Sequence, residues 1–410
     1  MARTEVVVTG LGATTPLGGD VATTWQALLD GRTGTAALAD DWPDVDLMPV
    51  RVVARLAVEP ADCLDYVETK RLDRCEQLAM VAARQAWSDA GLTEGSVAPN
   101  RLAVVIGTAL GCIGTLLSQH DLLRRHGPQK VSPHLIPMVM PNGPAAHVGL
   151  ALRARAGVHA PMSACAAGAE ALAWAWQLLQ VGAADVVVAG GAEACITPIA
   201  MAGFVRARSM SRDNFPPHQA SRPFDIDRNG FVLGEGAGIM VLERAGSAAA
   251  RGARVYGRLA GVGMSNDAYH ITAPDPDHAG QTSAVADALR SGDLSPSDIN
   301  HVNAHATATP LGDLAESGTI RTAIGDHPVV TAPKGGLGHL LGASGAVEAI
   351  ATVLSIREGV VPPTVNLDNQ DPAIELDVVA GKPRPLAITG AVSNSFGFGG
   401  HNVVLAFTPA

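Results

Sequence analysis

Short runs of apolar, β-branched residues recur between helix-like patterns, and this alternation restricts the fold more than any other feature of the chain. The runs are EVVVT at 5–9, LAVVIGT at 102–108 and ADVVVAGG at 184–191. Helical patterns lie at 21–31, at 75–91 and after residue 165. Strands that alternate with helices form parallel sheets covered by helices, so we expect an α/β fold. Residues 10–20 are predicted to be a loop, and the proline-rich residues 128–144 a crossing segment.

The composition supports a tightly packed α/β core. Hydrophobic residues make up 47% of the chain and aromatic residues only 4%, while 45 residues are glycine. Ala, Val and Leu must therefore fill the core with backbones close together. The 410 residues are enough for one large domain or two ordinary ones, and no linker-like segment divides them.

Two pairs of segments resemble each other within the chain. GLGATTPLGGD at 10–20 is similar to AHATATPLGD at 304–313, and HAPMSACAAGAEALA at 159–173 is similar to TAPKGGLGHLLGASGAVEAIA at 331–351. Chance similarity in a chain rich in Ala and Gly is one explanation. The other is a pair of similar α/β halves, 1–250 and 251–410, whose equivalent helix N-termini would face one central site.

Charge and cysteine usage restrict the partners and the compartment. The formal net charge is −10, which makes nucleic acid an improbable general partner. The first residues lack the pattern of a signal peptide, and no uncharged run has the character of a membrane helix. Five cysteines, an odd number without paired spacing, favour a reducing compartment. We therefore expect a cytoplasmic protein without membrane insertion.

Cys165 is the strongest candidate nucleophile. A free cysteine is most often a small buried core residue. Here, however, Ser163, Ala164 and the Ala-Ala-Gly that follows leave room for a bulky substrate. The position at the start of a helix also favours the thiolate, which is the reactive form. The other four cysteines lie in charged helical surroundings or in loops without such a setting.

Partners for this cysteine stand in two motifs of the second half. HVNAHATATPLGD contains His305, and APKGGLGHLLGASG contains Lys334 and His339. The glycine-dense segment 394–407 is predicted to be a loop that leads into a strand and directs backbone N–H groups at an oxyanion. Zinc is a poor interpretation because no ligand spacing is present. GLGATT lacks the third glycine of a dinucleotide site.

Four of these segments together resemble the signatures of β-ketoacyl-acyl carrier protein synthases of the elongating type II group. They are SACAAGAEAL, NAHATATPLGD, KGGLGHLLGASG and NSFGFGGHN, and the resemblance runs from about residue 4 to 407. It implies a thiolase-like fold of two βαβαβαββ halves in a five-layered αβαβα core, assembled as a homodimer. It also implies the reaction, a decarboxylative Claisen condensation of an acyl thioester with malonyl-acyl carrier protein in fatty-acid elongation.

The resemblance further implies a role for each matched residue. Cys165 would carry the acyl group, His305 and His339 would stabilise the enolate, and the N–H groups of Cys165 and Phe398 would form an oxyanion hole. Lys334 would orient the site together with Asp313 and Glu348. The remaining implied positions are Leu110, Thr307, Thr309 and Gly399 for substrate, and Lys70, Arg71, Lys130 and Arg208 for docking of the carrier protein. No metal and no organic cofactor is expected.

Other classes of protein with a similar sequence would lack one of these features. A non-catalytic chain-length subunit would lack Cys165, an initiating synthase would lack the second histidine, and a degradative thiolase would carry a second cysteine near the C-terminus. A nucleotide-binding oxidoreductase would need a phosphate loop. A ketosynthase of a dedicated polyketide or other secondary-metabolite pathway stays open, because its site would look the same.

Overall fold

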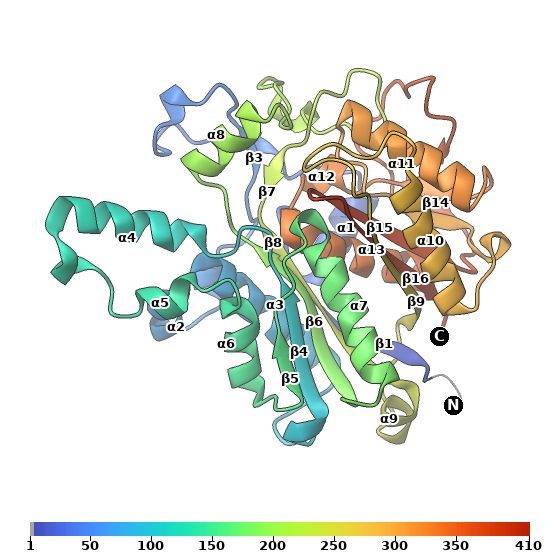
Figure 1. The fold of residues 1–410 in the computed structure, drawn as a ribbon, viewed down its shortest axis with the longest axis horizontal. Helices are drawn as coiled ribbons and strands as arrows, with labels where there is room; N and C mark the ends of the chain where they lie inside the picture. Colours follow the sequence, from blue (N-terminus) through green and yellow to red (C-terminus); the bar gives the residue numbers. More distant parts are fainter. Residues whose placement is uncertain (1–3) are drawn as a thin grey trace.

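The computed structural model describes residues 4–410, which form two sheet halves of corresponding strands (Figure 1). The first half contains β1 (Val6–Thr14), β4 (Leu102–Gly107), β5 (Gly157–His159), β6 (Val186–Glu193) and β8 (Gly236–Arg244). The second contains β9 (Gly257–Asn266), β10 (His301–Asn303), β11 (Val329–Thr331), β15 (Ala391–Gly397) and β16 (His401–Thr408).

The two halves share one strand order. It is β5-β4-β6-β8-β1 in the first half and β11-β10-β15-β16-β9 in the second, where β13 (Asp377–Val378) adds an outer strand. In each half the first three strands in this order are parallel and the last two pair antiparallel. The halves meet where β1 pairs with β9 over two residue pairs. The chain is therefore built from two copies of one topology.

Helices cover and separate the two sheet halves. On the outside, α3 (Arg74–Asp89) packs on β1, β6 and β8, and α10 (Ala279–Gly292) packs on β9, β16 and α11 (Pro310–Ala323). Between the halves, α7 (Ala167–Gln180) and α13 (Ser344–Glu358) contact strands of both. Residues 344–356 are all buried because α13 faces a sheet on either side. The predicted α/β class and five-layered arrangement are confirmed.

The topology shows which of the two internal sequence similarities reflects equivalent positions in the two halves. The residues Ala-Pro follow β5 at 160–161 and β11 at 332–333, the third strand of each half, so this pair of segments is structurally equivalent. The other pair does not match in this way. Residues 10–20 begin within β1, the first strand of the first half, whereas residues 304–313 follow β10, the second strand of the second half. That similarity is therefore not a structural correspondence.

One local prediction was wrong, and one segment has more helix than its prolines suggest. Residues 10–14 continue β1 instead of forming a loop. A Cβ on Gly10 or Gly12 would lie 2.2 Å or 2.0 Å from a carbonyl oxygen of α3, so these glycines permit close helix packing. The proline-rich segment is largely helical, with a 3₁₀ turn at Pro128–Lys130, α5 (Leu135–Val139) and the start of α6 (Gly143–Leu152).

Elements outside the core form two projections. Helix α4 (Ile113–His126) and α5 extend from the body as an arm (Figure 1). Above the arm in Figure 1 lie α8 (Pro198–Arg206) and a small sheet of β2 (Ala36–Ala37), β3 (Val52–Ala54) and β7 (Leu233–Gly234). Helices α1 (Val21–Leu29) and α2 (Tyr66–Arg71) complete the first half. Within residues 4–410 no helix is long and apolar enough to cross a membrane.

Candidate active site

Cys165 lies in a tight turn at the start of α7. It is the middle residue of the 3₁₀ turn Ala164–Ala166. Ala164 has φ +50°, a left-handed conformation that costs a non-glycine residue roughly 1–2 kcal/mol. A Cβ on Gly397 would lie 2.6 Å from the Ser163 carbonyl oxygen and 3.2 Å from the Cys165 nitrogen. The glycine at the end of β15 therefore lets this strand close over the turn that carries the sulfur.

The environment of the Cys165 thiol differs from the prediction. Burial raises its pKa to about 11, while the Phe398 N–H and the charge of Lys334 act in the opposite direction. Helix α7 begins only at Ala167, two residues after Cys165. The resting side chain is therefore a protonated thiol, and the thiolate depends on the Phe398 N–H and on Lys334.

His305 follows β10 and is held from two sides. Its backbone N–H donates to Glu316 at 2.8 Å, and its Nδ1 lies 3.3 Å from Lys334 Nζ. Because a protonated lysine only donates hydrogen bonds, Nδ1 is the acceptor and the imidazole proton sits on Nε2. Burial, with help from Lys334 and His339, holds the pKa of His305 well below its usual range. His305 is therefore a neutral donor through Nε2–H.

His339 is oriented in a similar way. Ser344 Oγ accepts the backbone N–H of Leu340 at 2.9 Å and lies 3.0 Å from His339 Nδ1, to which its proton can be donated. Burial lowers the pKa of His339 well below its usual range, and Lys334 lowers it further. The rings of His305 and His339 meet edge to face, 5.5 Å apart. Both neutral imidazoles thus keep a proton on Nε2.

Lys334 and the acids around it form a buried network. Lys334 donates to Glu348 at 2.5 Å, as predicted, and burial raises the pKa of Glu348 to about 7. Asp313 does not join this pair: it accepts from the backbone N–H of Phe224 at 2.9 Å and lies 3.6 Å from Arg228. The acid that supports His305 is Glu316, which lies three residues after Asp313 on α11. The sequence motifs did not point to Glu316.

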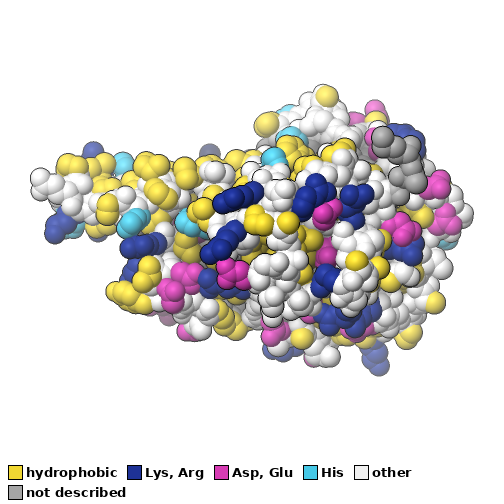
Figure 2. Space-filling model, turned by 90° about the horizontal axis from the view of Figure 1, so that it is seen from below, with side chains coloured by type: hydrophobic (Ala, Val, Ile, Leu, Met, Phe, Trp, Pro, Cys, Tyr) yellow, Lys and Arg dark blue, Asp and Glu magenta, His cyan; other side chains and the backbone are white. Residues whose placement is uncertain are grey.

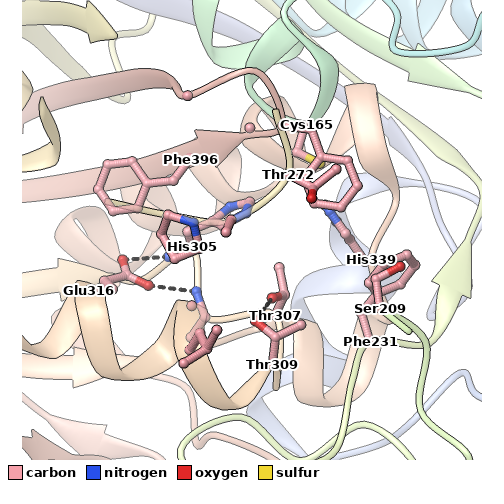
Figure 3. Close-up of a pocket in the computed structure, with 18 of the residues that line it drawn as sticks. Cys165, Ser209, Phe231, Thr272, His305, Thr307, Thr309, Glu316, His339 and Phe396 are labelled. Atoms are coloured by element: carbon pink, nitrogen blue, oxygen red, sulfur yellow. Dashed lines mark hydrogen bonds between the residues drawn. The ribbon is translucent and has the colours of Figure 1, made fainter. Parts of the chain in front are cut away.

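One cavity of about 380 Å³ brings the three central side chains together. Cys165, His305 and His339 face the same hollow, with Thr307 and Thr309 below them in Figure 3. Phe398 also lines it, and its backbone N–H acts on the Cys165 sulfur. The predicted site thus converges from both halves of the chain on one space.

Two predicted substrate residues lie outside the lining of this cavity. Gly399 occupies the hairpin turn between β15 and β16 with φ +84°, and its N–H donates to Ile271 at 2.7 Å. Residues 394–397 are strand, so the glycine-dense loop predicted there is confined to 398–400. Leu110 is 38% exposed at the base of the arm. Its backbone N–H is held by Glu193, at 3.2 Å from Oε1.

Glu193 was not anticipated and organises two loops. Its carboxylate accepts the N–H of Ala109 at 2.6 Å, of Gly111 at 2.9 Å and of Gly342 at 3.3 Å. It therefore ties the Leu110 loop to the turn that follows His339. Burial raises the pKa of Glu193 to about 7 although these N–H groups lower it. The hint in the sequence is an acid placed among small residues at the end of a strand.

The described residues offer no cluster typical of a transition metal. Among residues 4–410 no group of three or more His, Cys, Asp or Glu side chains is arranged to hold an ion. Four buried oxygens on β10, α13 and β15 lack a hydrogen-bond partner within the described residues, namely Asn303 Oδ1, Glu348 Oε2, Ser393 Oγ and Asn394 Oδ1. Oxygens of this kind suit ordered water or a hard cation. The expectation of no metal stays a prediction.

A duplicated α/β scaffold with one cysteine and two histidines on a shared cavity is the arrangement of a thiolase-like ketosynthase. Residues 3–248 match the model of the beta-ketoacyl synthase N-terminal domain, and residues 256–368 match that of the C-terminal domain. The chain therefore belongs to the β-ketoacyl synthase family, which makes it an acyltransferase of the ketosynthase type.

Individual relatives agree along nearly the whole chain. The 3-oxoacyl-[acyl-carrier-protein] synthase 2 of Mycobacterium tuberculosis is 47% identical over 98% of this chain and 96% of its own length. The ishigamide ketosynthase/chain length factor superposes with a TM-score of 0.92 at 32% identity over both full chains. A type II polyketide ketosynthase, solved in complex with its acyl-carrier protein and bound to the hexaketide, gives 0.91 at 28% identity, again over both full chains.

Proposed function

We propose that this chain condenses an acyl group carried on Cys165 with malonyl-acyl carrier protein to give 3-oxoacyl-acyl carrier protein in fatty-acid elongation. The observation that carries the proposal is the meeting of Cys165, His305 and His339 on one cavity. A nucleophile on one side and two neutral N–H donors on the other fit a reaction with an acyl-enzyme step and an enolate step.

The first step loads the acyl chain. The Cys165 thiolate attacks the thioester carbonyl of the acyl-carrier protein, and a new C–S bond forms. The oxygen becomes negative and accepts hydrogen bonds from the backbone N–H groups of Cys165 and Phe398. When this intermediate collapses, the old C–S bond breaks and the carrier leaves as a thiolate, which takes up the proton that the Cys165 thiol has released. Gly397 supports this step because it permits the close approach that brings Phe398 to the sulfur.

The second step uses the histidines. The malonyl thioester oxygen accepts hydrogen bonds from Nε2–H of His305 and His339. The bond to the terminal carboxylate breaks, carbon dioxide leaves, and the electron pair passes into an enolate that these donors stabilise. The enolate carbon then attacks the acyl-Cys165 carbonyl. A C–C bond forms, the C–S bond breaks, and Cys165 returns as a thiolate.

Intact-mass measurement after mixing with saturated acyl-acyl carrier protein tests the first step. We expect one acyl adduct, mapped by peptide analysis to Cys165 and lost in Cys165→Ala. Cys63, which is an exposed cysteine, supplies the matched control: Cys63→Ala should still be acylated. An adduct at another cysteine, or none with a competent carrier protein, would contradict the assignment.

Carrier-protein docking is proposed at Lys70, Arg71, Lys130 and Arg208. All four side chains are exposed, and none forms an ion pair within residues 4–410. Free basic groups of this kind attract an acidic partner over a Debye length of roughly 10 Å. Figure 2 shows Lys and Arg side chains gathered in several places on one face of the molecule. Arg208 also lines the reaction cavity, which places a positive charge at its mouth.

A homodimer is proposed from the apolar surface beside β5, the last strand of the sheet. Leu150 on α6 is 75% exposed, Ile136 on α5 is 66% exposed, and Trp174 on α7 is 38% exposed. The arm that carries α5 shows many hydrophobic side chains (Figure 2). Leu150→Glu should give a monomer in light scattering, whereas the equally exposed control Ile271→Glu should not. A dimer that survives Leu150→Glu unchanged would argue against this surface.

A dedicated polyketide pathway is the second candidate, because one similar structure is a ketosynthase of a type II polyketide system. The chemistry at Cys165 would be the same. Competition between the fatty-acid carrier protein and a pathway-specific one would distinguish the two by kcat/KM. A cytoplasmic location stays a prediction.

A further inference from the structure

Both ends of the arm are anchored on the first turn of α3. Asp73, the N-cap of α3, accepts the backbone N–H of Cys75 at 2.8 Å and that of Thr115 in α4 at 3.1 Å. Glu76 on the same turn lies against the other end of the arm. A Cβ on Gly143, the first residue of α6, would lie 2.0 Å from Glu76 Oε1. One helix turn thus holds the segment that enters the arm and the segment that leaves it.

Two thiols meet where the arm begins. Cys75 is the second residue of α3, and Cys112 is the N-cap of α4. The Cys75 thiol donates a hydrogen bond to the Cys112 sulfur. Both side chains are buried in one hydrophobic cluster, and neither lines the reaction cavity. Two helix starts that share one carboxylate therefore bring these cysteines into contact without giving them a role in the proposed reaction.

The contact is close to the arrangement of a disulfide. A disulfide requires sulfurs about 2 Å apart on Cβ atoms about 4 Å apart. Sulfurs that already share a hydrogen bond need only a small movement to reach that distance. The Cys112 sulfur can supply this movement, because Cys112 precedes the first turn of α4 and follows Gly111, which has a left-handed backbone with φ +69°.

A small oxidant has space beside this pair. A cavity of about 260 Å³ is lined by Asp73 and Arg74 on one side and by Gly114 and Thr115 on the other. These four residues lie within three positions of the two cysteines. A water molecule occupies roughly 30 Å³ of liquid, and hydrogen peroxide is little larger, so the cavity admits it. An oxidant of this size can therefore reach the surroundings of both thiols.

We propose that Cys75 and Cys112 form an oxidation site at which hydrogen peroxide closes a disulfide that fixes the arm to α3 and slows the reaction. In a reducing compartment such a pair stays as two thiols until the level of peroxide rises. The disulfide does not depend on the proposed function, whereas its effect on the reaction rests on that function.

The oxidation proceeds in two steps. The Cys112 thiolate attacks one peroxide oxygen, the O–O bond breaks, and a sulfenic acid and one water form. The Cys75 sulfur then attacks the Cys112 sulfur, the S–S bond forms, and the second water leaves. Each sulfur loses one electron, and the peroxide gains two. The hydrogen bond from Cys75 lowers the pKa of Cys112, but burial and the charge of Asp73 raise it above its usual value, so closure should be faster at higher pH.

Glu193 connects this site to the reaction cavity. Cys112 directly follows the loop whose Ala109 and Gly111 N–H groups donate to the Glu193 carboxylate. The same carboxylate accepts the N–H of Gly342, three residues after His339. Movement of Cys112 toward α3 pulls on this loop, so the disulfide should disturb the turn that follows His339.

The test uses the variant with Cys63→Ala and Cys165→Ala, which removes the exposed cysteine and the proposed nucleophile. After treatment with hydrogen peroxide, peptide mapping should show Cys75 linked to Cys112, and closure should be faster at about pH 9 than at about pH 7. Amides in the first turn of α4 should exchange with solvent at least about tenfold more slowly. Decarboxylation of malonyl-acyl carrier protein should fall several fold, and dithiothreitol should reverse every change.

Cys75→Ala and Cys112→Ala, each added to this variant, are the controls. They keep Cys195 and every methionine, so any effect of peroxide on those residues persists in them. Neither should show slower amide exchange or a loss of decarboxylation that dithiothreitol reverses. Absence of the disulfide, its formation with Cys195 instead, or unchanged decarboxylation in the closed form would overturn the inference. Failure of the reduced variant to release carbon dioxide would instead count against the proposed function, while mapping and amide exchange would still decide the disulfide.

Discussion

Cys165 and Gly342 occupy equivalent positions in the two halves of this molecule. Each is the middle residue of a three-residue 3₁₀ turn between the third strand of its half and a buried helix. Each also follows a residue with a left-handed backbone, Ala164 with φ +50° and Leu341 with φ +45°. One copy of this turn thus presents a thiol, and the other has no side chain at all.

The helices that follow these turns meet through equivalent glycines. A Cβ on Gly168, the second residue of α7, would lie 2.7 Å from the Gly342 carbonyl oxygen. A Cβ on Gly345, the second residue of α13, would lie 2.8 Å from the Ala169 Cβ. Two copies of one scaffold therefore place their helix starts against each other, as the internal similarity of the sequence led us to expect.

The difference between the halves is one of chemistry. The first half contributes Cys165, the proposed nucleophile, and the second contributes His305, Lys334 and His339. Gly342, the counterpart of Cys165 in the second half, donates its backbone N–H to the Glu193 carboxylate. A repeated scaffold can thus assign acyl transfer to one copy and enolate stabilisation to the other, and the two tasks can be tested separately.

Cys165→Ala should give the largest effect and remove the task of the first half alone. Acyl transfer and condensation should fall by at least about a thousandfold, because no nucleophile remains. Decarboxylation of malonyl-acyl carrier protein should continue, since His305 and His339 are intact. Carbon dioxide release and intact mass, measured on the same sample, give both readouts. A parallel loss of decarboxylation would show that the halves are not separable.

His339→Ala is the reciprocal change and should give the next largest effect. Loss of one preorganised donor to the enolate should slow decarboxylation about a hundredfold or more. Acylation of Cys165 should stay within a few fold, because His339 does not take part in that step. Single-turnover acylation and carbon dioxide release separate the two. Normal decarboxylation in this variant would remove His339 from the enolate role.

The halves should also differ in their response to pH. The pKa of Cys165 is about 11, so acyl transfer should rise about tenfold per pH unit from neutral pH upward as the thiolate fraction grows. The pKa values of His305 and His339 lie well below the usual range, so both stay neutral as the pH rises. Decarboxylation by Cys165→Ala should therefore show no step from these histidines between about pH 6 and 9. Because burial raises the pKa of Glu348 to about 7, the profile is also measured with Glu348→Gln added. A sigmoidal step near the ordinary histidine pKa that persists in that double variant would contradict the neutral assignment.

Glu193→Gln tests the link between the halves and should give the smallest effect, a reduction of condensation by several fold. The amide has one acceptor atom for the N–H groups of two loops, so the Leu110 loop should loosen. Loss of the negative charge should also move the pKa of Cys165 downward, because that charge raises it. Iodoacetamide alkylation against pH measures this shift.

Glu243→Gln is the matched control for this last variant. Glu243 is equally buried on β8 but pairs with Arg251 at 2.5 Å, away from the reaction cavity. Its alkylation profile should match that of the unchanged chain. An unshifted profile for Glu193→Gln would remove its electrostatic effect on the nucleophile.

The features that the sequence predicted are those encoded in short contiguous motifs. Cys165, His305, Lys334 and His339 each stand in such a motif, and the strand-helix alternation gives the layers. Glu316 could not be distinguished from Asp313, because residues one turn apart on a helix share a face and only tertiary contacts show which one reaches His305. Glu193 has partners 82 to 149 residues away, all of them backbone N–H groups that carry no sequence pattern.

The two outermost strands of the sheet have a consequence for folding and solubility. β13 has two residues and β5 has three, so each edge offers a foreign strand only one or two rungs of backbone hydrogen bonds. The central strands are up to ten residues long but have neighbours on both sides. The shortness of β5 and β13 therefore limits the addition of a foreign strand at either edge of the sheet. A subunit that docks beside β5 must be recognised through side chains such as Leu150 and Trp174 more than through the backbone.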